Sequence, residues 1–221
     1  MLLTKAFLKV LTLPHISSQT GKSFEEAIKE VLGSIGKLGE VHVPSKGRVV
    51  RQQELIDAKS WIYVPQPNGT QQAPDLMLYL MGHSVVPVEI KRSNNGKIMW
   101  NSGIPSIDTV YIYNGCSNSH KFNDDGISTG EKWSGTTFIL GGDIIQVDEI
   151  SALRDLKVSL NKLKRQYNEA SNSRWILMHI RPMFSEQNGR GARWLENPNR
   201  YYHESRVLAY IRKLEERGVP V

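Results

Sequence analysis

The chain has 221 residues, of which 39% are hydrophobic and 23% are charged, a composition typical of a globular protein and not of a disordered segment. Its single cysteine excludes an internal disulfide and favours a cytoplasmic location. No apolar run approaches the roughly 20 residues that a membrane-spanning helix requires, so we expect no membrane association. The formal net charge is +6, and residues 154–221 carry 14 basic against 7 acidic side chains. Such a local basic field fits a phosphate-bearing partner, although an ordinary solubilising surface has the same composition.

Hydrophobic periodicity predicts a mixture of helices and strands. Residues 23–35 have helical spacing, and short β-like runs follow between turn-forming residues, at 61–64, 75–80, 85–90, 109–113 and 137–145. A second helix is predicted over residues 149–169, with a buried stripe of Ile150, Leu153, Leu156, Leu160, Leu163 and Tyr167. A strand at 174–180 and a closing helix at 201–217 complete the order. We therefore expect one α/β domain, residues 1–221, with a mixed central sheet flanked by helices.

Two carboxylates are predicted to meet on adjacent strands. Asp75 opens one apolar run, and Glu89-Ile90-Lys91 closes the next. Because strand side chains alternate between faces, Glu89 and Lys91 should point the same way while Ile90 enters the core. A hairpin between the two runs would bring Asp75 beside Glu89. Paired carboxylates can hold Mg²⁺, and a neighbouring lysine can orient a water molecule or stabilise charge on a phosphate. Hydrolysis of a phosphodiester requires these groups.

A third acidic residue is expected from the first predicted helix. Ser23 and Glu26 have the spacing of a capping box, which gives Glu26 a structural task. Glu25 lies at the edge of the apolar arc, so we assign Glu25 to the site. The alternative is a solvated first-turn carboxylate stabilised by the helix dipole.

Pro74-Asp75, Glu89-Ile90-Lys91 and the Gly21-Lys22-Ser23-Phe24-Glu25 segment resemble the motifs of the PD-(D/E)XK nuclease superfamily, type II restriction endonucleases in particular. The resemblance covers roughly residues 21–142. It implies a restriction-endonuclease-like fold and Mg²⁺ held by Asp75, Glu89 and the Ile90 carbonyl. It also implies that Lys91 positions the water, that Glu25 assists, and that a homodimer cuts both strands of a short DNA site to leave 5′-phosphate ends.

Contacts to DNA are expected from three polar loops, at residues 45–60, 93–105 and 183–203, although each has the composition of an ordinary polar loop. Arginine, lysine, asparagine and glutamine are the side chains best suited to phosphates and base edges. The candidates are Arg48, Arg51, Gln52, Ser93, Asn94, Asn95, Lys97, Asn101, Arg190, Arg193, Asn199 and Arg200.

Two other readings of the site compete with a restriction enzyme. The chain could be a nuclease of the same superfamily directed to DNA structure or damage, or a non-catalytic nucleic-acid-binding protein in which the motif is accidental. A nucleotide cofactor is not expected. Thr20-Gly21-Lys22-Ser23 resembles the end of a phosphate-binding loop, but Ile16 stands where the first glycine of that loop belongs.

Overall fold

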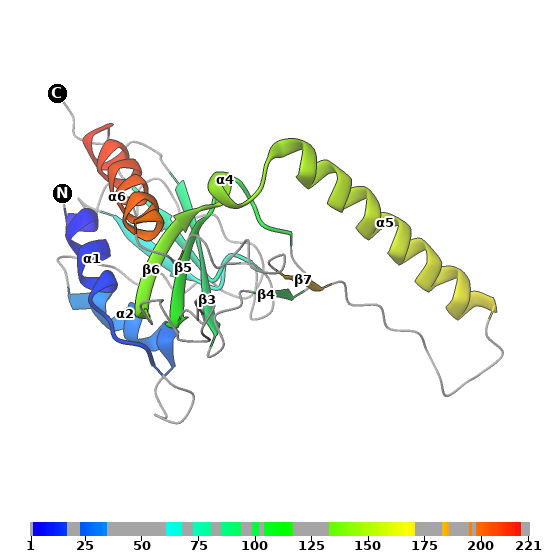
Figure 1. Ribbon diagram of the computed structural model, residues 1–221, viewed down its shortest axis with the longest axis horizontal. Helices are drawn as coiled ribbons and strands as arrows, with labels where there is room; N and C mark the ends of the chain where they lie inside the picture. Colours follow the sequence, from blue (N-terminus) through cyan, green and yellow to red (C-terminus); the bar gives the residue numbers. More distant parts are fainter. Residues whose placement is uncertain are drawn as a thin grey trace, which may run out of the picture.

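The computed structural model describes residues 2–16, 23–34, 61–67, 73–80, 85–93, 99–101, 104–116, 133–170, 183–185, 195 and 198–217. A five-stranded sheet with strand order β1-β2-β3-β5-β6 forms its centre (Figure 1). The strands are β1 (Ile62–Pro65), β2 (Leu76–Tyr79), β3 (Val85–Ser93), β5 (Val110–Cys116) and β6 (Ser134–Leu140). β3 and β5 are parallel, and the other neighbouring pairs are antiparallel. The predicted mixed α/β class is confirmed, while the strand predicted at 174–180 lies outside the described residues.

Helices cover one face of this sheet and enclose the main core (Figure 1). They are α1 (Leu2–Leu11), α2 (Phe24–Ser34) and α6 (Asn199–Arg217). Phe7 of α1, Ile28 of α2 and Ile211 of α6 pack against strand residues such as Val88 and Phe138, and all five are almost fully buried. Burial of an apolar side chain of this size contributes roughly 1.5–3 kcal/mol, so this layer is the main stabilising element of the fold.

Helix α1 is absent from the sequence-based prediction, although its buried residues Leu3, Phe7 and Val10 recur at helical spacing. A residue far along the chain stabilises its first turn. The Glu215 carboxylate of α6 accepts hydrogen bonds from the Leu3 amide at 2.7 Å, the Thr4 amide at 3.1 Å and the Thr4 hydroxyl at 2.5 Å. An acidic group satisfying the free amides of a helix start is favourable, so α6 supplies the cap that α1 lacks locally.

The opposite face of the sheet carries a smaller apolar cluster. Its buried members are Trp100, Tyr111, Tyr113, Ile139 and Leu195. Trp100 belongs to a separate two-stranded antiparallel sheet formed by β4 (Met99–Asn101) and β7 (Met183–Ser185). The Trp100 and Tyr111 rings meet edge to face with centroids 6.2 Å apart. This second face is therefore lined by aromatic rings, which matters for the site described below.

The strand predicted over residues 137–145 is wrong in its second half. β6 ends at Leu140, and α4 (Gly141–Ile144) turns the chain away from the sheet. The Gly141 amide donates to the Thr109 carbonyl at 2.8 Å, and a Cβ on Gly141 would overlap the Ser106 carbonyl oxygen. Only glycine allows this approach of two backbone segments, so the turn depends on a tertiary contact that hydrophobic periodicity does not report.

Helix α5 (Val147–Ala170) is present where a helix was predicted, but its stripe is not buried as expected. Ile150 is the only buried α5 residue. Leu156, Leu163 and Tyr167 are 50%, 56% and 43% exposed. In Figure 1 the helix extends away from the sheet. The apolar periodicity therefore predicts the helix correctly, but it does not show what covers the apolar side of the helix.

Candidate active site

The hairpin expected between the two apolar runs is formed by β2 and β3. Their antiparallel register pairs Leu76 with Val88 and Met77 with Pro87. Continued by one residue, this register sets Asp75 opposite Glu89. The Gln66 amide donates to the Asp75 carbonyl at 2.8 Å, which fixes the backbone at this point against the end of β1.

The two faces of β3 have different roles. Val86 and Val88 are buried in the main core, and Ile90 packs against that core. Side chains alternate along a strand, so Glu89 and Lys91 lie on the other face, as predicted. There the Lys91 Nζ donates to Glu89 Oε1 at 2.6 Å, with 19% and 13% of the two side chains exposed. Within the described part of the chain, nothing donates a hydrogen bond to the buried Glu89 Oε2.

Asp75 is linked directly to the same strand. Its Oδ2 accepts a hydrogen bond from the Ile90 amide at 2.7 Å. In a strand the N–H and C=O of one residue point to the same side. The Ile90 carbonyl therefore points to the same side of β3 as the Ile90 amide, toward Asp75 at the start of β2. A backbone oxygen and two carboxylates thus lie close together.

The electrostatics of this pair are unfavourable without a proton or a cation. Burial raises the pKa of the Asp75 carboxyl from 3.8 to about 6, and the negative charge of Glu89 adds to the rise. The Ile90 amide and the Lys91 ammonium act in the opposite direction. Adjacent carboxylates of this kind are stabilised either by a shared proton or by a bound cation.

Glu25 is close enough to take part in this electrostatic field. Its negative charge also raises the pKa of Asp75, although less than Glu89 does. Glu25 lies in the first turn of α2 and forms an ion pair with Lys29 at 3.0 Å. The neighbouring Glu26 has the structural task predicted for it, because its Oε2 accepts from the Ser23 amide at 2.7 Å and its own amide donates to Ser23 Oγ at 3.1 Å. The capping box is confirmed, and Glu25 remains available for the site.

The donor set fits a hard divalent ion such as Mg²⁺. Asp75 and Glu89 would supply carboxylate oxygens, including the buried Glu89 Oε2, and Ile90 would supply its carbonyl. Among the residues that the structure describes, no three His, Cys, Asp or Glu side chains cluster closely enough to hold a metal ion. Such an ion would thus rely on water for its remaining ligands, which is the usual preference of Mg²⁺.

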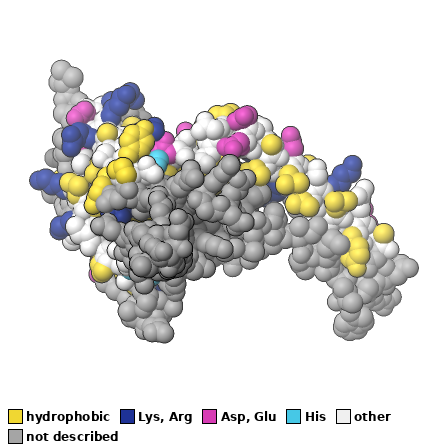
Figure 2. All heavy atoms as spheres, in the orientation of Figure 1, with side chains coloured by type: hydrophobic (Ala, Val, Ile, Leu, Met, Phe, Trp, Pro, Cys, Tyr) yellow, Lys and Arg dark blue, Asp and Glu magenta, His cyan; other side chains and the backbone are white. Residues whose placement is uncertain are grey.

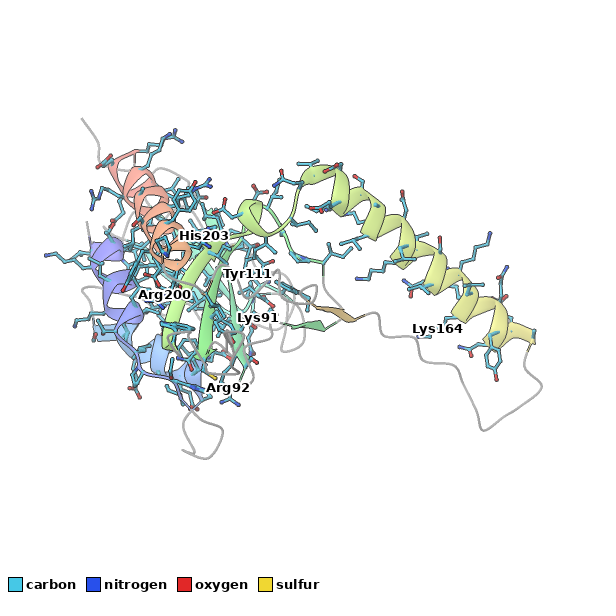
Figure 3. The ribbon with its side chains drawn as sticks, in the orientation of Figure 1. Lys91, Arg92, Tyr111, Lys164, Arg200 and His203 are labelled. Atoms are coloured by element: carbon cyan, nitrogen blue, oxygen red, sulfur yellow. The ribbon has the colours of Figure 1, made fainter. Side chains whose placement is uncertain are left out.

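Two tyrosines beside the carboxylates were not predicted as part of the site. The parallel register of β3 and β5 pairs Glu89 with Tyr111 and Lys91 with Tyr113; Lys91 and Tyr111 are labelled in Figure 3. The Tyr111 hydroxyl accepts from the Ser106 amide at 2.9 Å, and burial raises the pKa of Tyr111 to about 12. A neutral aromatic wall therefore borders the carboxylates. The alternation of tyrosines within residues 109–113 could have indicated it once the pairing of β3 with β5 was known.

Most of the predicted DNA contacts lie outside the described residues. These are Arg48, Arg51, Gln52, Asn94, Asn95, Lys97, Arg190 and Arg193. Asn101 lies in β4, but its side chain is not described, and Ser93 ends β3.

Two predicted DNA contacts begin α6. Asn199 is exposed at the helix start. The Arg200 side chain packs against other residues of the protein. Its guanidinium carbon lies 5.2 Å from the Trp133 ring centroid and 4.7 Å from that of Tyr201, and its Nε is 3.4 Å from Glu204 Oε1. With only 11% of its side chain exposed, Arg200 packs α6 against the aromatic face.

The chain matches no protein-family model, no curated protein and no solved structure. Across the described ranges, no helix has both the length and the apolar character needed to cross a bilayer. The function of the chain therefore has to be inferred from the site itself.

Proposed function

We propose that the chain is a Mg²⁺-dependent endonuclease of the type II restriction kind, which hydrolyses both strands of duplex DNA at a short site and leaves 5′-phosphate ends. The observation that carries the proposal is the meeting of Asp75, Glu89 and Lys91 at one edge of the sheet. Asp75 is hydrogen-bonded to the strand that presents Glu89, and Lys91 contacts Glu89 directly. The same three residue types on adjacent strands define the nuclease motif that the sequence resembles.

Each residue has a role that its position supports. Asp75, Glu89 and the Ile90 carbonyl would hold the ion, which supplies Lewis-acid stabilisation of the charge that develops on the phosphate. The Lys91 ammonium lies beside the same carboxylates, where it can orient the attacking water and donate to a phosphate oxygen. Glu25 reinforces the negative potential at this edge, which favours cation binding and opposes entry of the phosphate in the absence of a cation.

Cleavage of unmethylated plasmid DNA, with and without Mg²⁺, tests the proposal. We expect discrete fragments with 5′-phosphate ends in the presence of Mg²⁺ and intact plasmid in its absence. Asp75→Asn and Lys91→Met should each lower the cleavage rate by at least about 100-fold, since removal of one group that stabilises developing charge typically costs this much. Asp155→Asn and Lys213→Met, at exposed positions of α5 and α6, are the matched controls and should cleave normally.

The outcomes separate the competing functions. Cleavage restricted to branched or damaged duplexes would favour a structure-directed nuclease. Nucleic-acid binding without cleavage under any condition, unchanged in Asp75→Asn and Lys91→Met, would refute a nuclease and favour a non-catalytic binding protein.

A further inference from the structure

The outer surface of α1 and α6 carries positive charge that no neighbouring carboxylate neutralises. Lys5 and Lys9 of α1 and Arg212 of α6 are exposed. In the part of the chain that the structure describes, none of the three forms an ion pair. Both helices are described throughout, and Glu216 is their only exposed acidic residue. Figure 2 shows dark blue side chains gathered over these helices. Such a surface is complementary to a phosphate-bearing partner.

The two helices lie side by side and run in opposite directions (Figure 1). Glu215, near the end of α6, binds the first turn of α1. Leu13, just after α1, and Arg200, at the start of α6, both contact residues at the beginning of β6 or next to it. From the start of α6 to its end, the basic residues therefore follow in the order Lys9, Lys5, Arg212.

An exposed tyrosine lies at the other end of this row of charges. Tyr201 is 54% exposed. The Arg200 guanidinium carbon lies 4.7 Å from the centroid of its ring and 5.2 Å from that of Trp133, and Glu204 holds the guanidinium at 3.4 Å. The ring is therefore held in place before any ligand arrives, which lowers the entropy that is lost when a planar group stacks on it. Tyr201 lies on the same side of α6 as Arg212, because 11 residues make almost three whole turns of about 3.6 residues.

We propose that this α1–α6 surface, defined by Lys5, Lys9, Tyr201 and Arg212, binds single-stranded nucleic acid. An aromatic ring for stacking together with a row of cations along the backbone is the combination that single strands require. In a duplex the bases cover one another's faces, so an exposed ring favours an unpaired strand. Tyr201 and Arg212 are about 16 Å apart along the helix at about 1.5 Å per residue. This distance is long enough for several nucleotides.

The inference goes beyond the proposed nuclease function, because the surface is separate from the carboxylates. Phe7 of α1 and Ile211 of α6 pack in the main core on one face of the sheet, whereas Glu89 and Lys91 lie on the other face. The α1–α6 surface would therefore hold a strand away from the bond that is cut. Binding there is measurable without Mg²⁺ and without cleavage, so failure of one inference does not imply failure of the other.

Fluorescence anisotropy of a labelled oligothymidylate of about 10 nucleotides, titrated with the full chain in a chelator, tests the stacking. Tyr201→Leu should raise the dissociation constant about 5- to 150-fold, the usual effect of removing one stacked ring. Tyr201→Phe should bind like the wild type, because it keeps the ring. Tyr202→Leu is the matched control. Tyr202 is 58% exposed but is turned by about 100° around the helix, where its ring contacts Arg206, so this variant should bind normally.

The salt dependence of the same titration tests the charges. Each phosphate contact to a single strand contributes about 0.7 to the slope of log K against log salt concentration. Lys5→Gln/Arg212→Gln should therefore reduce the slope by about 1.4, which makes the loss of affinity between about 50 and 200 mM salt about 7-fold smaller. Arg154→Gln/Lys162→Gln removes the same charge from exposed positions of α5 and should leave the slope unchanged.

Several results would overturn the inference. The wild type could fail to bind the single strand, or it could bind the corresponding duplex more tightly. Tyr201→Leu could bind like the wild type while circular dichroism shows its fold retained, or Tyr202→Leu could weaken binding as much. Equal changes of slope in the two charge variants would show that the overall charge of the chain, and not the α1–α6 surface, attracts the strand.

Discussion

Replacing Asp75 by asparagine should stabilise the ion-free protein while removing its activity. Asparagine keeps the shape of the side chain and an oxygen that can accept from the Ile90 amide, the contact now made at 2.7 Å. It removes the negative charge that burial and Glu89 disfavour. The expected gain in stability and loss of function therefore come from the same charge.

The size of the gain follows from the pKa of Asp75, which rises from 3.8 to about 6 on folding. Between these values the folded protein holds the proton more tightly than the unfolded chain does, so the stability contributed by protonated Asp75 is present at low pH and is lost as the pH rises through about 6. A rise in the pKa of Asp75 from 3.8 to about 6 corresponds to about 3 kcal/mol in the free energy of unfolding. Because Asp75 is only partly buried, solvent screening reduces this to about 1–2 kcal/mol, or about 2–8 °C in Tm for a chain of this length.

Thermal unfolding in a chelator at pH 8 and pH 4 measures this effect. Asp75→Asn should unfold at a higher temperature than the wild type at pH 8, and most of the difference should disappear at pH 4. Millimolar Mg²⁺ should raise the Tm of the wild type and leave the variant unchanged. An equal or lower Tm for the variant at pH 8, or a difference that does not depend on pH, would refute the assignment of Asp75 as a strained carboxylate.

Three further pairs of substitutions test neighbouring parts of the structure. Glu25→Gln should lower the cleavage rate with little effect on Tm, whereas Glu26→Ala, which removes the acceptor of the capping box, should cost about 1 kcal/mol of stability and leave cleavage intact; the opposite pattern would reassign the two residues. Gly141→Ala should destabilise the fold by about 1–3 kcal/mol, because the new Cβ would overlap the Ser106 carbonyl oxygen. Gly142→Ala should be close to neutral in urea unfolding, because its Cβ would lie 3.8 Å from the nearest atom, the Ile107 carbonyl oxygen. Glu215→Ala should lower the free energy of unfolding by about 1–2 kcal/mol, because it removes the acceptor for the first amides of α1. Glu216→Ala, at an exposed position, should leave it unchanged. Similar values for the two variants in chemical denaturation would contradict the capping role.

Local patterns were sufficient to predict the hairpin that carries the carboxylates. Strand alternation placed Glu89 and Lys91 on one face and Ile90 on the other, and the antiparallel pairing of β2 with β3 set Asp75 opposite Glu89. The capping box likewise distinguished Glu26 from Glu25. These features depend on residues close together in the sequence, where periodicity and spacing carry the information.

Features that depend on distant residues were not predictable in the same way. The apolar run after Thr137 does not reveal that Gly141 meets Ser106, so the end of β6 was misplaced. The tyrosines beside the site required knowledge that β3 pairs with β5. Periodicity also shows that one side of α5 is apolar without showing what covers it, which explains why the predicted buried stripe is largely exposed.

The carboxylate of Glu215 ties together two helices whose bonded residues are 212 positions apart. During synthesis α1 leaves the ribosome long before its acceptor exists, so its first amides stay bound to water until α6 has emerged. Capping of α1 by α6 is therefore among the last steps of folding, whereas the packing of α1 on α2 and β6, such as that of Phe7 against Phe138, can form before α6 has emerged. A nascent chain stalled before residue 215 should consequently exchange the amide hydrogens of Leu3 and Thr4 faster than the released protein does.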